Sequence, residues 1–238
     1  ANICGAAQAD DTNQTIGVGH KIVAQKYGAA VTNNASSLTV IIQPSDVTNQ
    51  QGLELTGCVV TSFAISADSG TEGGRYKWSA TIQSGYLPDL DNTAAAGSTA
   101  YANTTTTALS AASGIKVYAT DAVLSSFTTT IDYPAVFTGI TSTGFEVVSR
   151  GAECSVTHDC QVKYDGATKG LVSSFDTQTA AMAENSFIIV NNGNFGIDTA
   201  NAVLTNVAYS EGDIMMLDVS FKAVDDGTDA LLEVDLSN

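Results

Sequence analysis

Basic residues are scarce in this sequence. Nine Lys and Arg stand against 25 Asp and Glu, which gives a formal net charge of −16. A surface this negative repels phosphate, so the composition argues against ordinary nucleic-acid binding. The acidic bias is compatible with simple solubility, with binding of divalent ions, or with a surface that does not adhere to DNA.

Long apolar stretches are also absent. The sequence contains no run of about 18 apolar residues, so no membrane span is expected. The first residues, ANICGAAQADD, contain no basic region followed by an apolar core, and they do not predict a secretory signal. A leader removed from a mature chain would leave the same start.

Histidine occurs only twice, at His20 and His158. A Ser-His-Asp triad needs a histidine beside its nucleophile, and the chain has no GxSxG elbow. The stretch GVGHK lacks the spacing of a phosphate-binding loop. Carboxylates are abundant, but nothing marks a pair of them as a hydrolytic site. The sequence therefore predicts no catalytic residue, no cofactor and no enzyme activity.

The four cysteines form no CxxC pair. Cys154, His158 and Cys160 form a CxxxHxC cluster whose even spacing would place all three on one face of a strand. A straight strand offers poor tetrahedral closure around zinc, so we predict no metal site and reduced, half-buried thiols.

Ser, Thr, Asn and Gly replace the missing charged residues, and this bias favours an all-β protein. Alternating or apolar runs separated by turn signals predict strands. Single strands are predicted around residues 21–25, 36–44, 53–66, 75–85, 145–151, 154–166, 187–193 and 231–237. Residues 115–132 are predicted to hold one or two strands, and 202–227 two strands joined by a Ser-Glu-Gly-Asp turn. We expect Leu232, Val234 and Leu236 to face inward.

The sequence indicates one domain over residues 1–238, with an N-terminal arm over about 1–35. The segment 86–114 has no sustained alternation, which predicts a long flexible loop. Residues 133–144 are interpreted as a turn-rich connection. One helix is expected within 170–187, capped by Ser173 or Ser174, with its helix formers in Thr177–Glu184. The stretch DDGTD (225–229) is interpreted as a hairpin turn.

One nine-residue pattern occurs twice. VTSFAISAD (60–68) and LSSFTTTID (124–132) share a serine, a phenylalanine and an aspartate in register. Each is followed by a glycine-bearing link, an alternating strand and a glycine turn. This order favours a duplicated β-unit, and several short strands with regular turns favour a sandwich or barrel.

The pattern GCVVTSFAISADSGTEGGRYKWSATIQSG resembles the major tail tube proteins of long-tailed bacteriophages. The order of SSFTTTIDYP, SRGAECSVTHDCQVKYDG, a short helix, FIIVNNG, AVLTNVAYSEGD and IMMLDVSFKAVDDG is similar to that family's downstream order. The likeness covers residues 53–237 and rests on pattern rather than on invariant residues.

The resemblance implies a β-sandwich or half-barrel with one flanking helix. Subunits of such proteins form rings, usually of six, whose inner strands join into a continuous β-barrel. The rings stack into a tube through which genomic DNA passes without specific binding. The implied partners are further copies of the chain and other tail proteins. The implied location is the virion tail, assembled in the host cytoplasm, with no catalysis, cofactor or membrane contact.

A bore that carries DNA needs carboxylates that repel the polyanion. The lumen-lining candidates are Asp218, Glu233 and Asp235, on the outward sides of the long strands. The candidates for contact between rings lie in the predicted loop and are Tyr86, Asp89, Asp91 and Tyr101.

Three alternatives fit the same composition. The first is a capsid decoration protein or another virion β-protein. The second is a secreted or surface adhesin, with or without calcium. The third is a hydrolase built on a β-sandwich.

Overall fold

The computed structural model describes residues 20–24, 38–42, 51–91, 108–112, 114–142, 144–150, 154–177, 183–191, 195–210, 212–225 and 231–236. These residues form mostly β-strands and one short α-helix, so the predicted all-β class is confirmed. Every strand pair among them is antiparallel.

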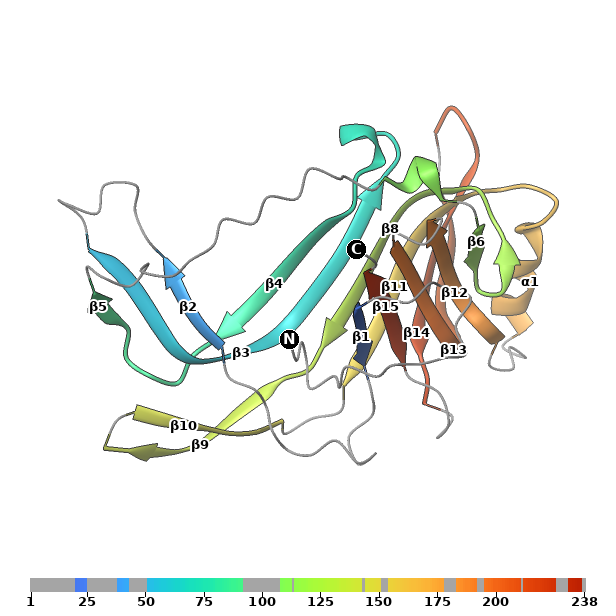
Figure 1. Cartoon of the computed structure of the whole chain (residues 1–238). Helices are drawn as coiled ribbons and strands as arrows, with labels where there is room; N and C mark the ends of the chain where they lie inside the picture. Colours follow the sequence, from blue (N-terminus) through green and yellow to red (C-terminus); the bar gives the residue numbers. More distant parts are fainter. Residues whose placement is uncertain are drawn as a thin grey trace.

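The strands make two layers that share one strand, β13 (Figure 1). The first, which we call the long-strand layer, has the order β4-β3-β8-β11-β14-β13. It contains β3 (Gly52–Asp68), β4 (Lys77–Gln83), β8 (Leu124–Asp132), β11 (Ser155–Lys163), β14 (Met216–Ala223) and the C-terminal part of β13 (Phe195–Ser210). The second layer contains β7 (Thr120–Asp121), β6 (Gly114–Val117), β12 (Ala183–Asn191), the N-terminal part of β13, β15 (Leu232–Leu236) and β1 (His20–Ala24).

The core lies between the two layers. On β8, β11 and β14 every second side chain is buried, as the alternating sequence predicts. Phe187 of β12 packs against Phe127 of β8 and Phe221 of β14, with ring centroids 5.6 and 5.7 Å apart. Leu232 and Val234 of β15 are fully buried, which confirms the predicted inward side for these two residues. Burial of apolar surface from both layers holds them together.

The repeated nine-residue pattern forms one antiparallel pair, β3 with β8. Ser62 lies opposite Asp132, and Asp68 lies opposite Ser126. The two copies are therefore related by a local two-fold axis through the middle of the pair. Outside this pair, β4 follows β3 and β11 follows β8 in the sheet, so each copy keeps its own alternating partner strand. This arrangement supports a duplicated β-unit.

A part of the molecule that we call the wing projects away from the two layers (Figure 1). It consists of β2 (Leu38–Ile42), β5 (Asp89–Asp91) and the N-terminal half of β3, to which both pair. The hairpin of β9 (Ala135–Thr141) and β10 (Gly144–Arg150) extends on the same side. Residues 133–144 were expected to be a turn-rich connection, and β9 shows that this expectation was wrong.

The segment 86–114 is only partly a loop in the structure. It contains β5 near its start and a 3₁₀ turn, η2 (Leu109–Ala111), near its end, and its last residue is the first of β6. Leu109 is buried beside Gly74, at the end of a second 3₁₀ turn, η1 (Glu72–Gly74). Residues 92–107 and 113 lie outside the described residues, as does most of the predicted N-terminal arm.

The helix is shifted relative to the prediction. α1 spans Lys169–Thr177, so Ser173 and Ser174 lie inside it and are not its caps. The turn before it is held by Asp165, whose carboxylate accepts the backbone N–H groups of Ala167 and Thr168 at 2.9 and 3.2 Å. These hydrogen bonds fix the turn that leads into the helix, and they lower the pKa of Asp165.

The C-terminal connection also differs from the expectation. A hairpin turn at DDGTD would make β14 and β15 neighbours. Among the described strands, β15 pairs with β13 and β1, whereas β14 pairs with β11 and β13. The predicted hairpin is therefore wrong, because the chain passes from one layer to the other between these strands.

Gly57 lies in β3 between the residues that pair with β5 and those that pair with β4. Its φ is +59°, and a Cβ at this position would overlap the ring of Tyr86. We expect Gly57→Ala to lower the free energy of unfolding by about 2–3 kcal/mol, since it adds steric overlap to a left-handed backbone. Chemical denaturation measures this change.

Gly73 provides the matched control, because its φ is +69° and no atom lies within 4 Å of an added Cβ. Gly73→Ala should cost only the backbone term, about 1–2 kcal/mol. Equal losses for the two variants would show that Tyr86 does not pack on Gly57.

Candidate functional site: the polar face of the long-strand layer

The outer surface of the long-strand layer is polar along its whole central part. Because side chains alternate across a strand, the residues between the buried positions of β3, β8, β11 and β14 share this surface. We call it the polar face. Its central members are Ser66, Asp68, Ser126, Thr128, Asp159, Gln161, Asp218 and Ser220.

These residues stand in rows across the strands. One row runs from Asp68 through Ser126 and Gln161 to Asp218, and the next runs from Ser66 through Thr128 and Asp159 to Ser220. Together they form the floor of a concavity of about 550 Å³. Thr71, Arg75 and Lys77 also line it, from the side of η1 and β4.

Two of the carboxylates on this face accept hydrogen bonds from neutral side chains. Ser220 Oγ donates to Asp159 Oδ1 at 2.6 Å, and Gln161 Nε2 donates to Asp218 Oδ1 at 3.1 Å. A neutral donor fixes a carboxylate without cancelling its charge. Asp68, Asp132, Asp159 and Asp218 share this surface with Lys163 and Lys222, and Arg75 and Lys77 line the same concavity. Short hydroxyl side chains are therefore combined with acidic and basic groups in nearly equal number.

The three lumen-lining candidates from the sequence do not lie together. Asp218 is a half-buried member of the polar face. Glu233 and Asp235 belong to β15 in the second layer, opposite Asp198 and Gly196 of β13. Glu233 is therefore not part of the polar face, because alternation along a strand identifies the outward side but not the layer.

The candidates for contact between rings lie on the wing. Tyr86 is half-buried and covers Gly57 of its own chain, so packing explains it. Asp89 is exposed and lies opposite Glu54 of β3, and Asp91 lies opposite Gly52. Tyr101 lies outside the described residues.

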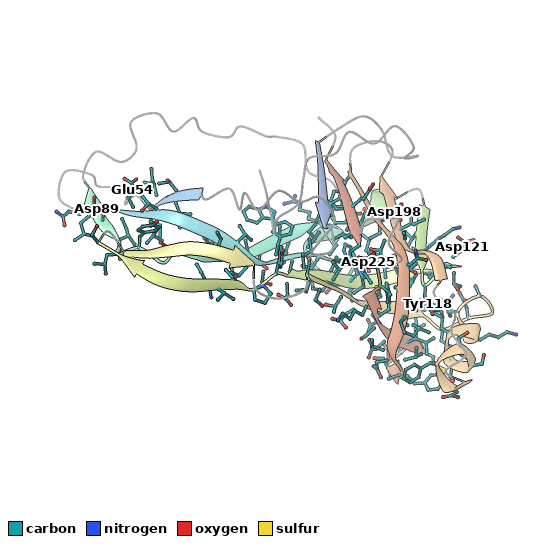
Figure 2. All side chains as sticks on the ribbon, turned by 90° about the horizontal axis from the view of Figure 1, so that it is seen from below. Glu54, Asp89, Tyr118, Asp121, Asp198 and Asp225 are labelled. Atoms are coloured by element: carbon teal, nitrogen blue, oxygen red, sulfur yellow. The ribbon has the colours of Figure 1, made fainter. Side chains whose placement is uncertain are left out.

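Figure 2 shows Glu54 and Asp89 at the end of the wing, and Asp121, Asp198 and Asp225 far from them in the two layers. These carboxylates do not converge on one cavity.

His158, the residue of the sequence most typical of catalysis, lies in the core. Its Nδ1 is 2.9 Å from Thr129 Oγ1 of β8, and its Nε2 is 2.9 Å from Thr199 Oγ1 of β13. The ring also packs against Phe187 and Phe221, with both centroids 4.8 Å away. Burial lowers the pKa of His158 to about 3. A neutral imidazole has one donor and one acceptor nitrogen, so it joins the two layers by one hydrogen bond of each kind.

Cys154, His158 and Cys160 are all buried, and the latter two point into the core from alternate positions of β11. Burial raises the pKa of the Cys160 thiol. Within the described ranges, no three His, Cys, Asp or Glu side chains are grouped so that they could hold a metal ion. No helix in the described part of the chain is both long and apolar enough to cross a membrane.

Asp68, Asp132 and Asp159 were not among the predicted site residues. A signal for two of them is present in the sequence, because Asp68 and Asp132 close the two copies of the repeated pattern. No comparable signal marks Asp159, whose place beside Ser220 depends on the pairing of β11 with β14.

Comparison with known proteins assigns no family. A scan against protein-family models and a search of curated proteins found no match to this chain. The resemblance to tail tube proteins therefore stands on the quoted sequence patterns alone.

Proposed function

We propose that this chain is a structural subunit of a bacteriophage tail tube, and that copies of it surround a channel for DNA. The observation that carries the proposal is the polar face. One side of β3, β8, β11 and β14, the four central strands of the long-strand layer, is buried in the core, and the other side presents hydroxyl groups and carboxylates to solvent. A wall with these two sides separates a packed interior from an aqueous channel.

The chemistry of the face suits a sliding polyanion. Tight DNA binding requires several Lys or Arg contacts to phosphates. Here Asp159 and Asp218 accept hydrogen bonds from the neutral side chains of Ser220 and Gln161. Short serine and threonine side chains add polarity without offering cations. Asp68, Asp159 and Asp218 line the same concavity as Arg75 and Lys77, so phosphates meet no purely basic surface there, which favours passage over binding.

The proposal places the protein in the virion tail, with copies of itself and other tail proteins as partners. Its test is electron microscopy of the concentrated, purified protein. The expected result is hollow tubes of uniform width built from stacked rings. Discrete monomers at every concentration and salt condition would contradict the proposal.

The lining is tested on the same tubes with two variants of identical chemistry. Asp218→Lys adds a cation to the polar face, whereas Glu233→Lys adds one to the second layer. Tubes of the first variant should retain double-stranded DNA at low salt and release it as salt rises. Tubes of the second should behave like wild type. Equal retention by both variants would show that the polar face does not line the channel.

A further inference from the structure

Two edges of the long-strand layer carry no further strand among the described residues. β4 pairs only with β3, and β13 beyond Ala202 pairs only with β14. These edges lie at opposite ends of the strand order. An unpaired edge exposes backbone donors and acceptors to any strand that can approach it.

The two edges have matching side-chain patterns. On β4, Trp78 lies on the core side, opposite Ile65, and is 74% exposed. On β13, Tyr209 lies on the core side, opposite Leu217, and is 52% exposed. Their neighbours on the polar face are small, with Ser79 on β4 and Ala208 on β13. Joining the edges would cover both aromatic rings and continue the polar face without a break.

Comparison of the two repeated units indicates what kind of strand can pair with the outer edge of β4. Phe63 lies opposite Ala80 in the first unit, and its equivalent Phe127 lies opposite Cys160 in the second. One pleat further, Trp78 occupies the place of His158. On the edge of β11 that faces away from β8, His158 lies opposite Phe221 of β14. In the first unit, no strand of the described part of the chain occupies the place that β14 has in the second.

Strand direction selects the partner. All six strands of the layer alternate in direction, so β4 and β13 run oppositely. A second copy related by rotation about an axis along the strands would set its β4 antiparallel to β13 of the first copy. Such a head-to-tail contact forms a ring when the rotation between neighbouring copies is a whole fraction of a turn.

The β4 edge and the β13 edge carry opposite charges at the same end of the long-strand layer. Arg75 and Lys77 stand at the start of β4, and Asp213 follows the end of β13. On α1, Asp176 lies close enough to Tyr209 for its charge to act on the tyrosine hydroxyl. The basic end of one edge would meet the acidic end of the other.

We infer that the β4 edge of one copy pairs antiparallel with the C-terminal part of β13 of the next copy. The occupant of each edge is a second copy of this chain. The inference rests on the proposed function, in which copies assemble, and it names the strands that join them.

Cysteine cross-linking tests the pairing in a Cys4→Ser background, whose three other cysteines are buried. Ser79→Cys is combined in turn with Asn206→Cys, Ala208→Cys and Ser210→Cys, which all face the same side. Oxidation of assembled protein should give a ladder of covalent oligomers for the combination that lies in register. The control, Thr128→Cys with Ala208→Cys, uses an interior strand and should stay monomeric.

The outcomes separate this inference from the proposed function. Tubes seen by microscopy without any ladder from the three combinations would overturn the inference and leave the tube intact. Covalent dimers from Ser79→Cys alone would indicate a two-fold contact between two β4 edges and would also overturn it. Monomers under all conditions would overturn both proposals.

A charge exchange gives a second, independent readout. Arg75→Glu with Lys77→Glu should raise the protein concentration needed for assembly at least tenfold. Adding Asp213→Lys to the same chain should recover most of that loss. Loss of assembly without recovery, in variants whose far-UV circular dichroism is native, would contradict the contact.

Discussion

Replacing Phe221 with alanine is expected to lower the free energy of unfolding by about 3–5 kcal/mol. Phe221 is 1% exposed, and its ring lies 4.8 Å from His158, 5.7 Å from Phe187 and 6.3 Å from Tyr118 between centroids. The truncation removes apolar contacts from both layers at once, and strands on every side limit collapse into the cavity. Guanidinium denaturation of dilute protein measures the loss.

Leu87→Ala is the control, since Leu87 is 87% exposed. A surface truncation of this kind should change the free energy of unfolding by less than about 0.5 kcal/mol. A loss below about 1 kcal/mol for Phe221→Ala would mean that the two layers do not pack through this ring.

Acid should destabilise the protein through His158 by an amount comparable to that core truncation. The folded-state pKa is about 3, below the ordinary value of about 6.5 that applies in the unfolded chain. Between these two pKa values the imidazole is protonated in the unfolded state and neutral in the folded state. The contribution is fully present above pH 6.5 and is lost as the pH falls toward 3, by about 5 kcal/mol in total.

The comparison variant is His158→Gln, which keeps a hydrogen-bonding group but does not titrate. At pH 8, the difference in free energy of unfolding between wild type and His158→Gln gives the cost of the substitution itself. This difference should shrink by about 1.4 kcal/mol per pH unit below pH 6, because only the wild type loses stability there. Parallel curves would contradict a neutral buried imidazole. In a His20→Gln variant, the remaining imidazole signals in NMR spectra should not shift between pH 8 and pH 4.

The sequence predicts the strands well where burial alternates along them. On β11, Val156, His158, Cys160 and Val162 are all buried at every second position, so the pattern alone identifies the inward side. Helix propensity predicted the wrong position for the helix. Thr177–Glu184 contains good helix formers, yet Ala183 and Glu184 belong to β12 and lie opposite Ala202 and Asn201. Pairing with β13 outweighs their weak local preference.

Strand order could not be obtained from the sequence, and the site depends on it. Asp218 and Glu233 have the same local environment, one acidic residue between two buried apolar neighbours. The pairing of β14 with β11 assigns Asp218 to the polar face, and the pairing of β15 with β13 assigns Glu233 to the second layer. Cross-strand partners lie far apart in the chain, so periodicity carries no information about them.

The shared strand β13 has a mechanical consequence. Its N-terminal part pairs with β12 and β15, and its C-terminal part pairs with β14. One layer therefore cannot slip over the other without tearing backbone ladders at this strand. Shear along the strands is resisted by many hydrogen bonds loaded together, whereas peeling at the wing loads only a few at a time. Under tension the wing should yield first and the wall around the core last.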